Sequence, residues 1–358
     1  MNKNRRAFLK DIAMASSAIG VLGKAHAETE IAVDFKRIAA EETFSIPEVL
    51  DAMRDLLERD PDREPGLSAP PYIVTDTIRV LYDLGESRIA SMDRAGIDKQ
   101  ILSLWSPGVQ VFGAQQGTEL ASFVNERLAE AVSRYPDRFA GLATVAPQDP
   151  SSAAQEIERA ISSLHLNGVL INSHTKSEYL DSPKYWPIFE AAEALDTPIY
   201  LHPRTPSEKM YPAFTDYLMD RALWGFAAET SHHVVRLLMS GLFDEFPGLT
   251  VVLGHMGEGI PFWLDRLDQV SSRAGMPALK RRPSEYFKNN FMITTSAMFW
   301  DPVLMFCHSV LGPERLMFAV DSPFASSEQG TRWMDATPLS NSDKRKIYQE
   351  NAERVFSL

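Results

Sequence analysis

The segment Pro198-Ile-Tyr-Leu-His-Pro-Arg204 decides the fold of this chain. It is a short apolar run that ends abruptly at His202, because Pro203 cannot continue a central strand. Seven other short runs have the same strand-forming composition, and longer segments with apolar residues at three- and four-residue spacing separate them. With Pro198–Leu201, the predicted strands are Arg37–Ala40, Lys99–Leu104, Phe139–Val145, Gly168–Asn172, Thr250–Gly254, Phe291–Thr295 and Leu316–Val320. The predicted helices include Ser152–Leu164, Pro183–Leu195, Glu229–Phe246 and Ser342–Phe356.

Strands that alternate with helices in this way predict an α/β fold, a (β/α)8 TIM barrel. Such a barrel carries its chemistry at the C-terminal ends of its strands, so reactive residues should follow most of the runs. They do: the residues concerned are Glu41, Glu42, Trp105, Ser106, His174, His202, His255, Ser296 and Asp321. A doubly wound open sheet is the alternative, but no Gly-rich phosphate turn follows any predicted strand.

Composition and charge narrow the function classes. The sequence has 36 Lys and Arg against 48 Asp and Glu, a formal net charge of −12, which disfavours a nucleic-acid or anionic-membrane binder. A single cysteine, Cys307, excludes an internal disulfide and a thiolate metal site. We expect one barrel domain over residues 28–358, with inserted loops near 60–98 and 203–228.

Residues 1–27 are predicted to be a twin-arginine-type signal peptide. Arg5 and Arg6 precede a short apolar stretch, Ile12–Leu22, and Ala25-His26-Ala27 places small residues at the two cleavage-site positions. The stretch is shorter than the about 20 apolar residues that a membrane helix needs. Without this segment, 31 basic and 47 acidic residues remain, which gives −16. We expect export by the twin-arginine machinery to the periplasm or beyond, and no membrane span in the mature protein.

Glu41, His202 and Asp321 are candidate metal ligands at strand ends. His202 offers a neutral imidazole nitrogen, although a histidine here could instead hydrogen-bond a loop. Asp321 is either a metal ligand or a helix cap. The ligand role is favoured because Glu41 and His202 are expected at the same mouth of the barrel, formed by the C-terminal ends of the strands. Glu41 and Glu42 cannot both face inward in an extended strand, so we choose Glu41 and expect Glu42 to form a salt bridge or face the barrel wall. This ligand set suits one divalent ion, Mn²⁺, Zn²⁺ or another of intermediate hardness, and we expect Mn²⁺ or Zn²⁺.

His255, in Gly254-His-Met-Gly-Glu-Gly259, is the candidate acid or base. Glu258, which we expect at the start of the following helix, could hold its tautomer. Alternatively, His255 could cap that helix and Glu258 could interact with the helix dipole. Arg266, eight residues further on, could contact an anionic substrate if its helix lies against the mouth; an exposed arginine is the simpler interpretation. His174 is either a substrate contact or a loop-stabilising residue.

At these motifs the chain resembles the amidohydrolase-related family, in the branch that contains aminocarboxymuconate-semialdehyde decarboxylase and the orthohydroxybenzoate decarboxylases for γ-resorcylate and 2,3-dihydroxybenzoate. The resemblance runs from about Arg37 to Leu358. Its most specific motifs are Ala40-Glu-Glu-Thr-Phe-Ser-Ile-Pro47, Gly96-Ile-Asp-Lys-Gln-Ile-Leu-Ser103, Tyr135-Pro-Asp-Arg-Phe-Ala-Gly141, Tyr200-Leu-His-Pro-Arg204, Ser240-Gly-Leu-Phe-Asp-Glu-Phe-Pro247, Gly254-His-Met-Gly-Glu-Gly-Ile-Pro261 and Asp321-Ser-Pro-Phe324.

The resemblance implies a metal-dependent, non-oxidative decarboxylase of an aromatic ortho-hydroxy or related unsaturated carboxylic acid, without an organic cofactor. Glu41, His202 and Asp321 would bind the metal, and a substrate carboxylate and its ortho hydroxyl would chelate it. Asp321 would protonate the ring carbon that bears the carboxylate, and the dearomatised intermediate would then lose CO₂. His255 and Glu258 would tune the charge around the site.

The resemblance also assigns a substrate-orienting role to Arg266 and implies a homodimer or homotetramer. Trp105 and Phe324 could enclose an aromatic ring. Many members have a Glu-x-His motif at the first strand, whereas Thr43 stands here two residues after Glu41, which counts against a hydrolytic amidohydrolase. The alternatives are a metal-dependent hydrolase of a lactone, ester or amide, and a non-catalytic exported binding protein.

Overall fold

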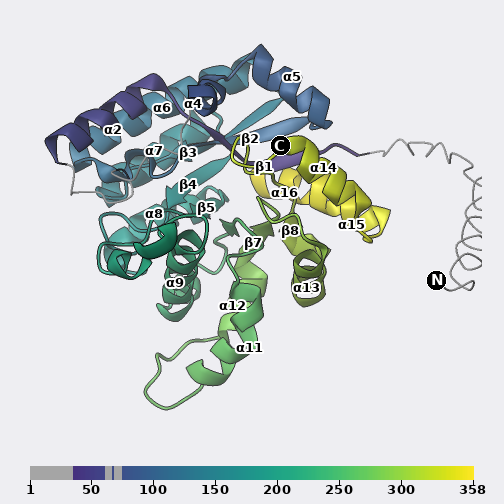
Figure 1. Cartoon of the computed structure of the whole chain (residues 1–358). Helices are drawn as coiled ribbons and strands as arrows, with labels where there is room; N and C mark the ends of the chain where they lie inside the picture. The colour runs from purple at the N-terminus through teal and green to yellow at the C-terminus, as the bar shows by residue number, and fades with distance from the viewer. Residues whose placement is uncertain (1–34, 61–66, 68–74) are drawn as a thin grey trace, which may run out of the picture. The chain divides into compact units, whose positions relative to one another are not determined.

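A computed structural model describes residues 35–60, 67 and 75–358 (Figure 1). All of them belong to one compact unit, Phe35–Leu358. Its eight strands form one parallel sheet in sequence order, from β1 to β8. The strands are β1 (Ile38–Phe44), β2 (Lys99–Leu104), β3 (Phe139–Thr144), β4 (Gly168–Asn172), β5 (Ile199–His202), β6 (Val251–Leu253), β7 (Phe291–Thr294) and β8 (Leu316–Met317). The predicted signal peptide, residues 1–27, lies outside the described residues.

Backbone hydrogen bonds between β1 and the segment after β8 close this sheet. The Ala40 N–H donates to the Phe318 carbonyl at 3.0 Å, and the Thr43 N–H donates to the Ser322 carbonyl at 2.8 Å. The parallel order and this closure make a TIM barrel, so the predicted fold is confirmed.

Helices surround the barrel, and most connect one strand to the next (Figure 1). They are α2 (Pro47–Arg59), α4 (Thr75–Tyr82), α5 (Glu86–Ala95), α6 (Ala114–Arg134), α7 (Pro150–Ser162), α8 (Trp186–Ala194), α9 (Gly225–Met239), α10 (Leu242–Glu245), α11 (Ile260–Ser271), α12 (Pro283–Asn290), α13 (Asp301–Leu311), α14 (Ser327–Ala336), α15 (Asn341–Arg345) and α16 (Asn351–Phe356). The helix predicted over Glu229–Phe246 is divided at Gly241, whose φ of 83° ends α9 and starts α10. A π-helical turn, Lys346–Glu350, joins α15 to α16 within the predicted Ser342–Phe356 helix.

The core has two layers. Inside the barrel, small residues such as Ala40 and Ala140 leave room for the larger Tyr200 and Met292, and all of them are buried. Outside it, alternate strand residues pack against the helices, as do Leu102 in β2 and Ile171 in β4. This alternation fixes which side chains reach the mouth of the barrel.

The two segments predicted as insertions contain mostly short elements. The 60–98 segment includes α4 and α5, and residues 61–66 and 68–74 lie outside the described part. The 203–228 segment contains two 3-10 turns, Tyr211–Phe214 and Asp216–Leu218, and their status as insertions stays a prediction. In the part of the chain that the structure describes, no helix is both long and apolar enough to cross a membrane.

Candidate active site

Glu41, His202 and Asp321 meet at the mouth of the barrel. They come from β1, the end of β5 and the segment after β8. One possible ligand atom from each lies within 4.8 Å of the others, as the strand-end prediction required. Glu41 is 1% exposed, and the side chains of His202 and Asp321 are 14% and 15% exposed, so the cluster is sheltered but reachable.

The two oxygens of the Glu41 carboxylate have different surroundings. Oε2 accepts hydrogen bonds from the Tyr200 hydroxyl, from Ser296 Oγ at 2.7 Å and from Thr294 Oγ1 at 3.3 Å. Oε1 is buried without a hydrogen-bond partner among the described residues, and His202 Nε2 lies 3.5 Å from it. A buried, unpaired carboxylate oxygen is costly, and a cation bound there would remove that cost. The residues therefore fit a divalent metal ion.

The partners of His202 fix the nitrogen that it presents. Its Nδ1 lies 3.1 Å from Asn172 Oδ1 and 2.8 Å from the Pro203 carbonyl, and both of these atoms are acceptors. Nδ1 therefore carries a proton, which makes Nε2, the nitrogen facing Glu41, the one that can offer a lone pair to a metal. This tautomer is the one a metal ligand needs.

His255 lies on a tight turn beside this cluster. Residues 255–259 all have positive φ, from 49° to 78°, and the turn ends where α11 begins at Ile260. Glu258 is thus in the turn and not, as predicted, at the start of the helix. His255 Nδ1 donates to Glu258 Oε1 at 2.8 Å, while Nε2 lies 3.7 Å from both Glu41 Oε1 and Asp321 Oδ2. The imidazole therefore lies between the Glu258 carboxylate in the turn and the Glu41 and Asp321 carboxyl groups in the mouth.

Gly254 is required at the end of β6. A Cβ at this position would lie 2.6 Å from Glu41 Oε2, which is closer than real Cβ contacts. The glycine thereby lets the His255 turn approach Glu41, and the His255 N–H donates to Ser296 Oγ at 2.9 Å.

The two mouth carboxylates differ in acidity. Burial opposes ionisation of Glu41, but the positive charge of His255 outweighs it, with help from His202 and Ser296, and lowers the pKa of Glu41 to about 2. Burial raises the pKa of Asp321, the Glu41 carboxylate adds to the rise, and His255 only partly opposes it. Asp321 is therefore the carboxyl group that holds a proton more readily.

A β-bulge determines which of the two adjacent glutamates enters the mouth. The register of β1 against β2 shifts between Ala39 and Glu42. Ala40 belongs to the barrel interior and Glu41 reaches the mouth, so two consecutive residues face the same side. The choice of Glu41 agrees with this geometry. The predicted end of the first strand at Ala40 is wrong, since β1 continues to Phe44.

Comparison with known proteins shows the family. Residues 81–358 match the amidohydrolase family. The gamma-resorcylate decarboxylase of Rhodococcus jostii (strain RHA1) is 38% identical over 339 residues, which cover 90% of this chain and 98% of that protein. The chain belongs to the amidohydrolase family.

Solved structures of related proteins agree with this family assignment. The 5-carboxyvanillate decarboxylase of Sphingomonas paucimobilis has a TM-score of 0.87 and 44% identity, covering 90% of this chain and 99% of that one. The 5-carboxyvanillate decarboxylase of Novosphingobium aromaticivorans, complexed with manganese and 4-hydroxy-3-methoxy-5-nitrobenzoic acid, has a TM-score of 0.87 and 40% identity, covering 91% and 97%. These similarities confirm the predicted family and branch. They support the prediction that this protein is an enzyme, and that it is a metal-dependent decarboxylase rather than a hydrolase.

His174 is placed for loop stabilisation. It is 2% exposed, its Nε2 lies 3.0 Å from the Thr205 carbonyl, and its Nδ1 accepts the Ser177 N–H at 3.1 Å. Burial, followed by the charge of Arg204, lowers the pKa of His174 to about 2. Both nitrogens are therefore engaged by loop backbone, which favours the loop-stabilising alternative over substrate contact.

Among the described residues, Arg266 takes no part in the hydrogen bonds and ion pairs that link the other site residues. Its side chain is exposed on α11 and forms no hydrogen bond or ion pair with any of them in the described chain. Trp105 and Phe324, in contrast, lie together at the mouth after β2 and β8. Their rings are stacked with centroids 6.5 Å apart, and Phe324 is 47% exposed.

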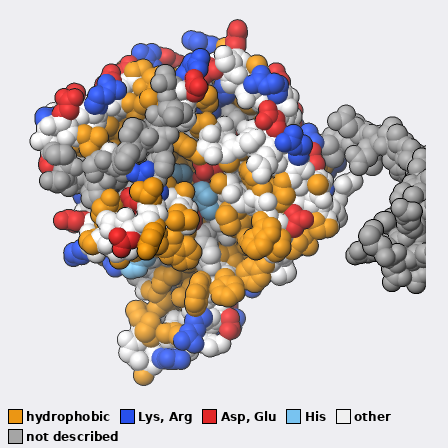
Figure 2. All heavy atoms as spheres, in the orientation of Figure 1, with side chains coloured by type: hydrophobic (Ala, Val, Ile, Leu, Met, Phe, Trp, Pro, Cys, Tyr) orange, Lys and Arg blue, Asp and Glu red, His pale blue; other side chains and the backbone are white. Residues whose placement is uncertain are grey.

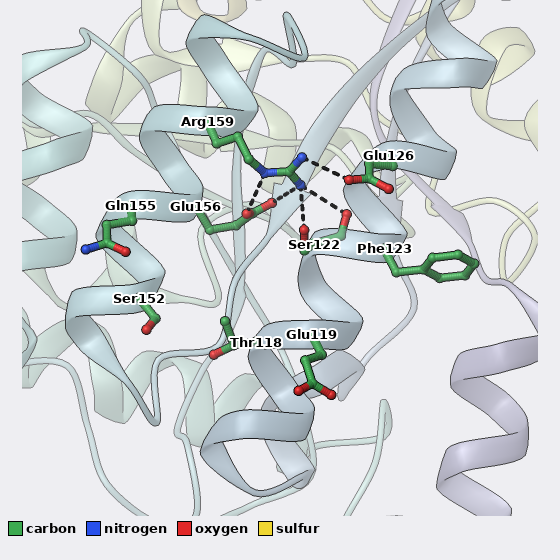
Figure 3. A pocket seen from close by; sticks show the side chains of 9 residues that line it. All are labelled: Thr118, Glu119, Ser122, Phe123, Glu126, Ser152, Gln155, Glu156 and Arg159. Atoms are coloured by element: carbon green, nitrogen blue, oxygen red, sulfur yellow. Dashed lines mark hydrogen bonds and ion pairs between the residues drawn. The ribbon is translucent and has the colours of Figure 1, made fainter.

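A separate cavity of about 580 Å³ lies between α6 and α7, on the outer layer (Figure 3). Figure 3 shows Arg159 directed at Glu126 and Glu156, with which it forms ion pairs of 3.1 and 2.8 Å. None of the metal-ligand candidates lines this cavity. We therefore assign it no part in the chemistry of the mouth.

Tyr200, Thr294 and Asn172 were missed by the sequence analysis, and Ser296 was given no role. Tyr200 had a usable signal, because it lies two residues before His202 and the two must face the same side of β5. Thr294 and Ser296 have the same two-residue spacing at the end of β7. Their hydroxyls orient Glu41, as the partners of metal ligands commonly do.

Proposed function

We propose that this protein is a divalent-metal-dependent, non-oxidative decarboxylase of an aromatic acid with a hydroxyl group ortho to the carboxylate. The observation that carries the proposal is the Glu41, His202 and Asp321 cluster, with one unpaired Glu41 oxygen directed into it. The decarboxylase relatives point to the same chemistry.

The protein's own residues have separable tasks. A bound dication would stabilise negative charge on the phenolic oxygen and orient the carboxylate. Asp321 holds a proton in a buried carboxyl group and delivers it to the ring carbon that bears the carboxylate. The C–C bond then breaks and CO₂ leaves. His255, fixed by Glu258, lies 3.7 Å from Asp321 and supports the return of a proton to it.

The stacked pair Trp105 and Phe324 forms the aromatic wall for the substrate ring. These two rings follow β2 and β8, which border β1 and its Glu41 on either side. Offset stacking of a benzoate against such a wall is worth about 0.5–1.5 kcal/mol beyond area burial.

We propose Mn²⁺ as the resident ion, with Zn²⁺ as the alternative. Two carboxylates and one imidazole are ligands that suit either ion. Manganese is the ion in the Novosphingobium aromaticivorans complex, which supports the first choice.

The test is metal analysis of the purified protein, followed by parallel assays of CO₂ release and hydrolysis. Hydroxybenzoates, carboxylated methoxyphenols, lactones and esters are supplied in turn to the wild type and to Asp321→Asn. We expect CO₂ from an ortho-hydroxybenzoate, lost in Asp321→Asn and retained in Asp335→Asn, an exposed aspartate paired with Arg37. Hydrolysis without CO₂ would establish the hydrolase alternative. Bound metal with no turnover at all would establish the binding protein.

We also propose that residues 1–27 direct twin-arginine export to the periplasm or beyond. The support is the Arg5-Arg6 pair and the small residues at Ala25 and Ala27. The full chain carrying Arg5→Lys and Arg6→Lys should stay in the cytoplasm after fractionation, while the unaltered chain is exported. Equal distribution of both chains contradicts this proposal.

We further propose that a second copy of the chain covers an exposed aromatic surface, giving a homodimer or homotetramer. Phe262 and Trp263 of α11 and Phe306 of α13 are 71%, 55% and 39% exposed, and the Phe262 ring contacts the other two. Hydrophobic side chains gather over this part of the molecule (Figure 2). A fully exposed aromatic side chain buries about 150–250 Å², so these three partly exposed rings supply roughly a third to a half of the about 800 Å² per partner of a stable interface.

Light scattering after size exclusion tests the assembly. Phe262→Lys combined with Trp263→Lys should give a monomer. Val80→Lys, which alters an exposed residue of α4, should leave the assembly unchanged. A monomeric wild type would overturn the proposal.

A further inference from the structure

The Glu42 carboxyl group accepts backbone hydrogen bonds from both sides of Asp321. Glu42 is 0% exposed. Its Oε1 accepts the Val320 N–H at 2.9 Å, and its Oε2 accepts the Ser322 N–H at 3.2 Å. The two amides that flank the predicted proton donor are therefore held by one side chain.

The amide of Asp321 itself completes a row of three. It donates to the Glu41 carbonyl at 2.9 Å, so the N–H groups of residues 320, 321 and 322 all point at Glu41 and Glu42. Asp321 has a φ of 71°, in the left-handed region. Successive amides in such a turn form a concavity that receives acceptor oxygens, and here the Glu42 carboxyl oxygens accept two of the three amides.

A buried chain of polar side chains supports Glu42 from outside the barrel. Gln100 Nε2 donates to Glu42 Oε2 at 3.4 Å, and Arg88 Nη1 donates to Gln100 Oε1 at 3.3 Å. Arg88, on α5, also donates to the Thr43 carbonyl at 2.8 Å. Gln100 and Arg88 are 3% and 5% exposed, so the orientation of the carboxylate is fixed by packed neighbours.

Barrel closure does not need this side chain. The Ala40 and Thr43 amides already bond to the Phe318 and Ser322 carbonyls at 3.0 and 2.8 Å, through backbone atoms alone. The Glu42 carboxyl group additionally holds the Val320 and Ser322 amides of the 318–322 segment, from which Asp321 projects into the mouth.

We infer that Glu42 is a positioning residue, which sets the direction of the Asp321 carboxyl group by holding the Val320 and Ser322 amides. The inference rests on the proposed function in assigning Asp321 to the metal and to proton delivery. It assigns Glu42 a role distinct from that of the adjacent Glu41, which enters the mouth itself.

Three variants of the full-length protein test it. Glu42→Gln keeps the shape of the side chain but turns one acceptor oxygen into a donor that faces an amide. Gln100→Met removes a donor to Glu42 and leaves both amide bonds. Glu156→Gln is the matched control, a buried glutamate of α7 that bonds Asn125 at 2.7 Å outside the site. The measurements are the Mn²⁺ dissociation constant, the electron paramagnetic resonance spectrum of bound Mn²⁺, kcat and KM for CO₂ release, and the unfolding temperature.

We expect Glu42→Gln to weaken Mn²⁺ binding and lower kcat by about 10–100-fold, with an altered Mn²⁺ spectrum and a much smaller change in KM. Gln100→Met should fall between Glu42→Gln and the wild type, and Glu156→Gln should match the wild type in all but unfolding temperature. Wild-type affinity, spectrum and kcat in a folded Glu42→Gln would overturn the inference. If Glu42→Gln does not fold, wild-type values in Gln100→Met overturn it. A wild type that binds Mn²⁺ but releases no CO₂ refutes the proposed function alone, because affinity and spectrum still report on Glu42.

Discussion

The Tyr200 hydroxyl donates a hydrogen bond to Oε2 of Glu41 inside the barrel. Both side chains are 1% exposed, and burial together with the Glu41 carboxylate raises the pKa of Tyr200 well above its ordinary value. The phenol therefore keeps its proton at neutral pH and remains a hydrogen-bond donor. Since Oε2 is held in this way, only Oε1 is left to face the mouth.

Tyr200→Phe should weaken Mn²⁺ binding by about tenfold, the lower end of the range for a lost partner of a metal ligand. Ser296 still donates to Oε2 at 2.7 Å, which limits the effect. Titration of the metal-free protein with Mn²⁺ measures it. Tyr185→Phe is the control, since Tyr185 donates to Glu178 at 2.8 Å away from the site. Equal affinities for both variants would show that the Tyr200 hydroxyl does not orient Glu41.

Removal of the metal should cost stability as well as activity. An ion that binds only the folded chain adds about 2.7 kcal/mol to the free energy of unfolding at 100 times its dissociation constant. Chelator-treated protein should therefore melt at a lower temperature, and Mn²⁺ should restore the wild type but not His202→Ala. His308→Ala, which removes a histidine paired with Asp343 on the surface, should respond like the wild type. Restoration of His202→Ala to the same extent would remove His202 from the ligand set.

The strand prediction succeeded where burial on both faces gives continuous apolar runs. Lys99–Leu104 and Gly168–Asn172 have the same bounds in the sequence analysis and in the structure. It failed at β1, because Glu41 and Glu42 interrupt the apolar run although both are buried. Charged residues enter the interior there for the chemistry of the site, which hydrophobic pattern alone cannot anticipate.

The convergence of Glu41, His202 and Asp321 was predictable because strand ends meet at one mouth of the barrel. The role of Glu42 was not, because it depends on a register shift in β1 and on amides 278 and 280 residues away in the sequence. Simple alternation from Ala40 would even have pointed Glu42 inward. The choice of Glu41 from the sequence had no geometric reason, and the register shift in β1 supplies one.

Glu258→Gln should lower kcat by about 10–100-fold and leave Mn²⁺ affinity nearly unchanged, because Glu258 acts on His255 and not on the metal cluster. The carboxylate holds His255 Nδ1 at 2.8 Å. Initial rates of CO₂ release at saturating Mn²⁺ measure the effect. Asp343→Asn is the matched control, a carboxylate that pairs with His308 Nε2 at 3.2 Å on the surface. A loss of metal affinity as large as the loss of kcat would mean that the pair acts through the ligands.

His233, outside the mouth of the barrel, should make the protein sensitive to acid. This histidine is 0% exposed, and its Nε2 accepts the Leu180 N–H at 3.0 Å, so the ring is neutral. Burial, then the charge of Arg236 and the neighbouring His232, lower the pKa of His233 to about 3. Protonation would destroy the bond to Leu180.

The folded pKa of His233 lies below the value of about 6.5 in an unfolded chain, so between about pH 6.5 and 3 the unfolded state binds the extra proton. His233 therefore contributes stability that is complete above pH 6.5 and falls by up to about 1.4 kcal/mol per pH unit as the pH decreases. Urea unfolding at pH 7, 6 and 5 should give a shallower loss in His233→Gln, whose side-chain oxygen can still accept the Leu180 N–H. Ser173→Ala removes the Nδ1 partner at 3.2 Å but keeps the ring, so it should retain the wild-type slope. Parallel slopes for the wild type and His233→Gln would show that other groups control acid unfolding.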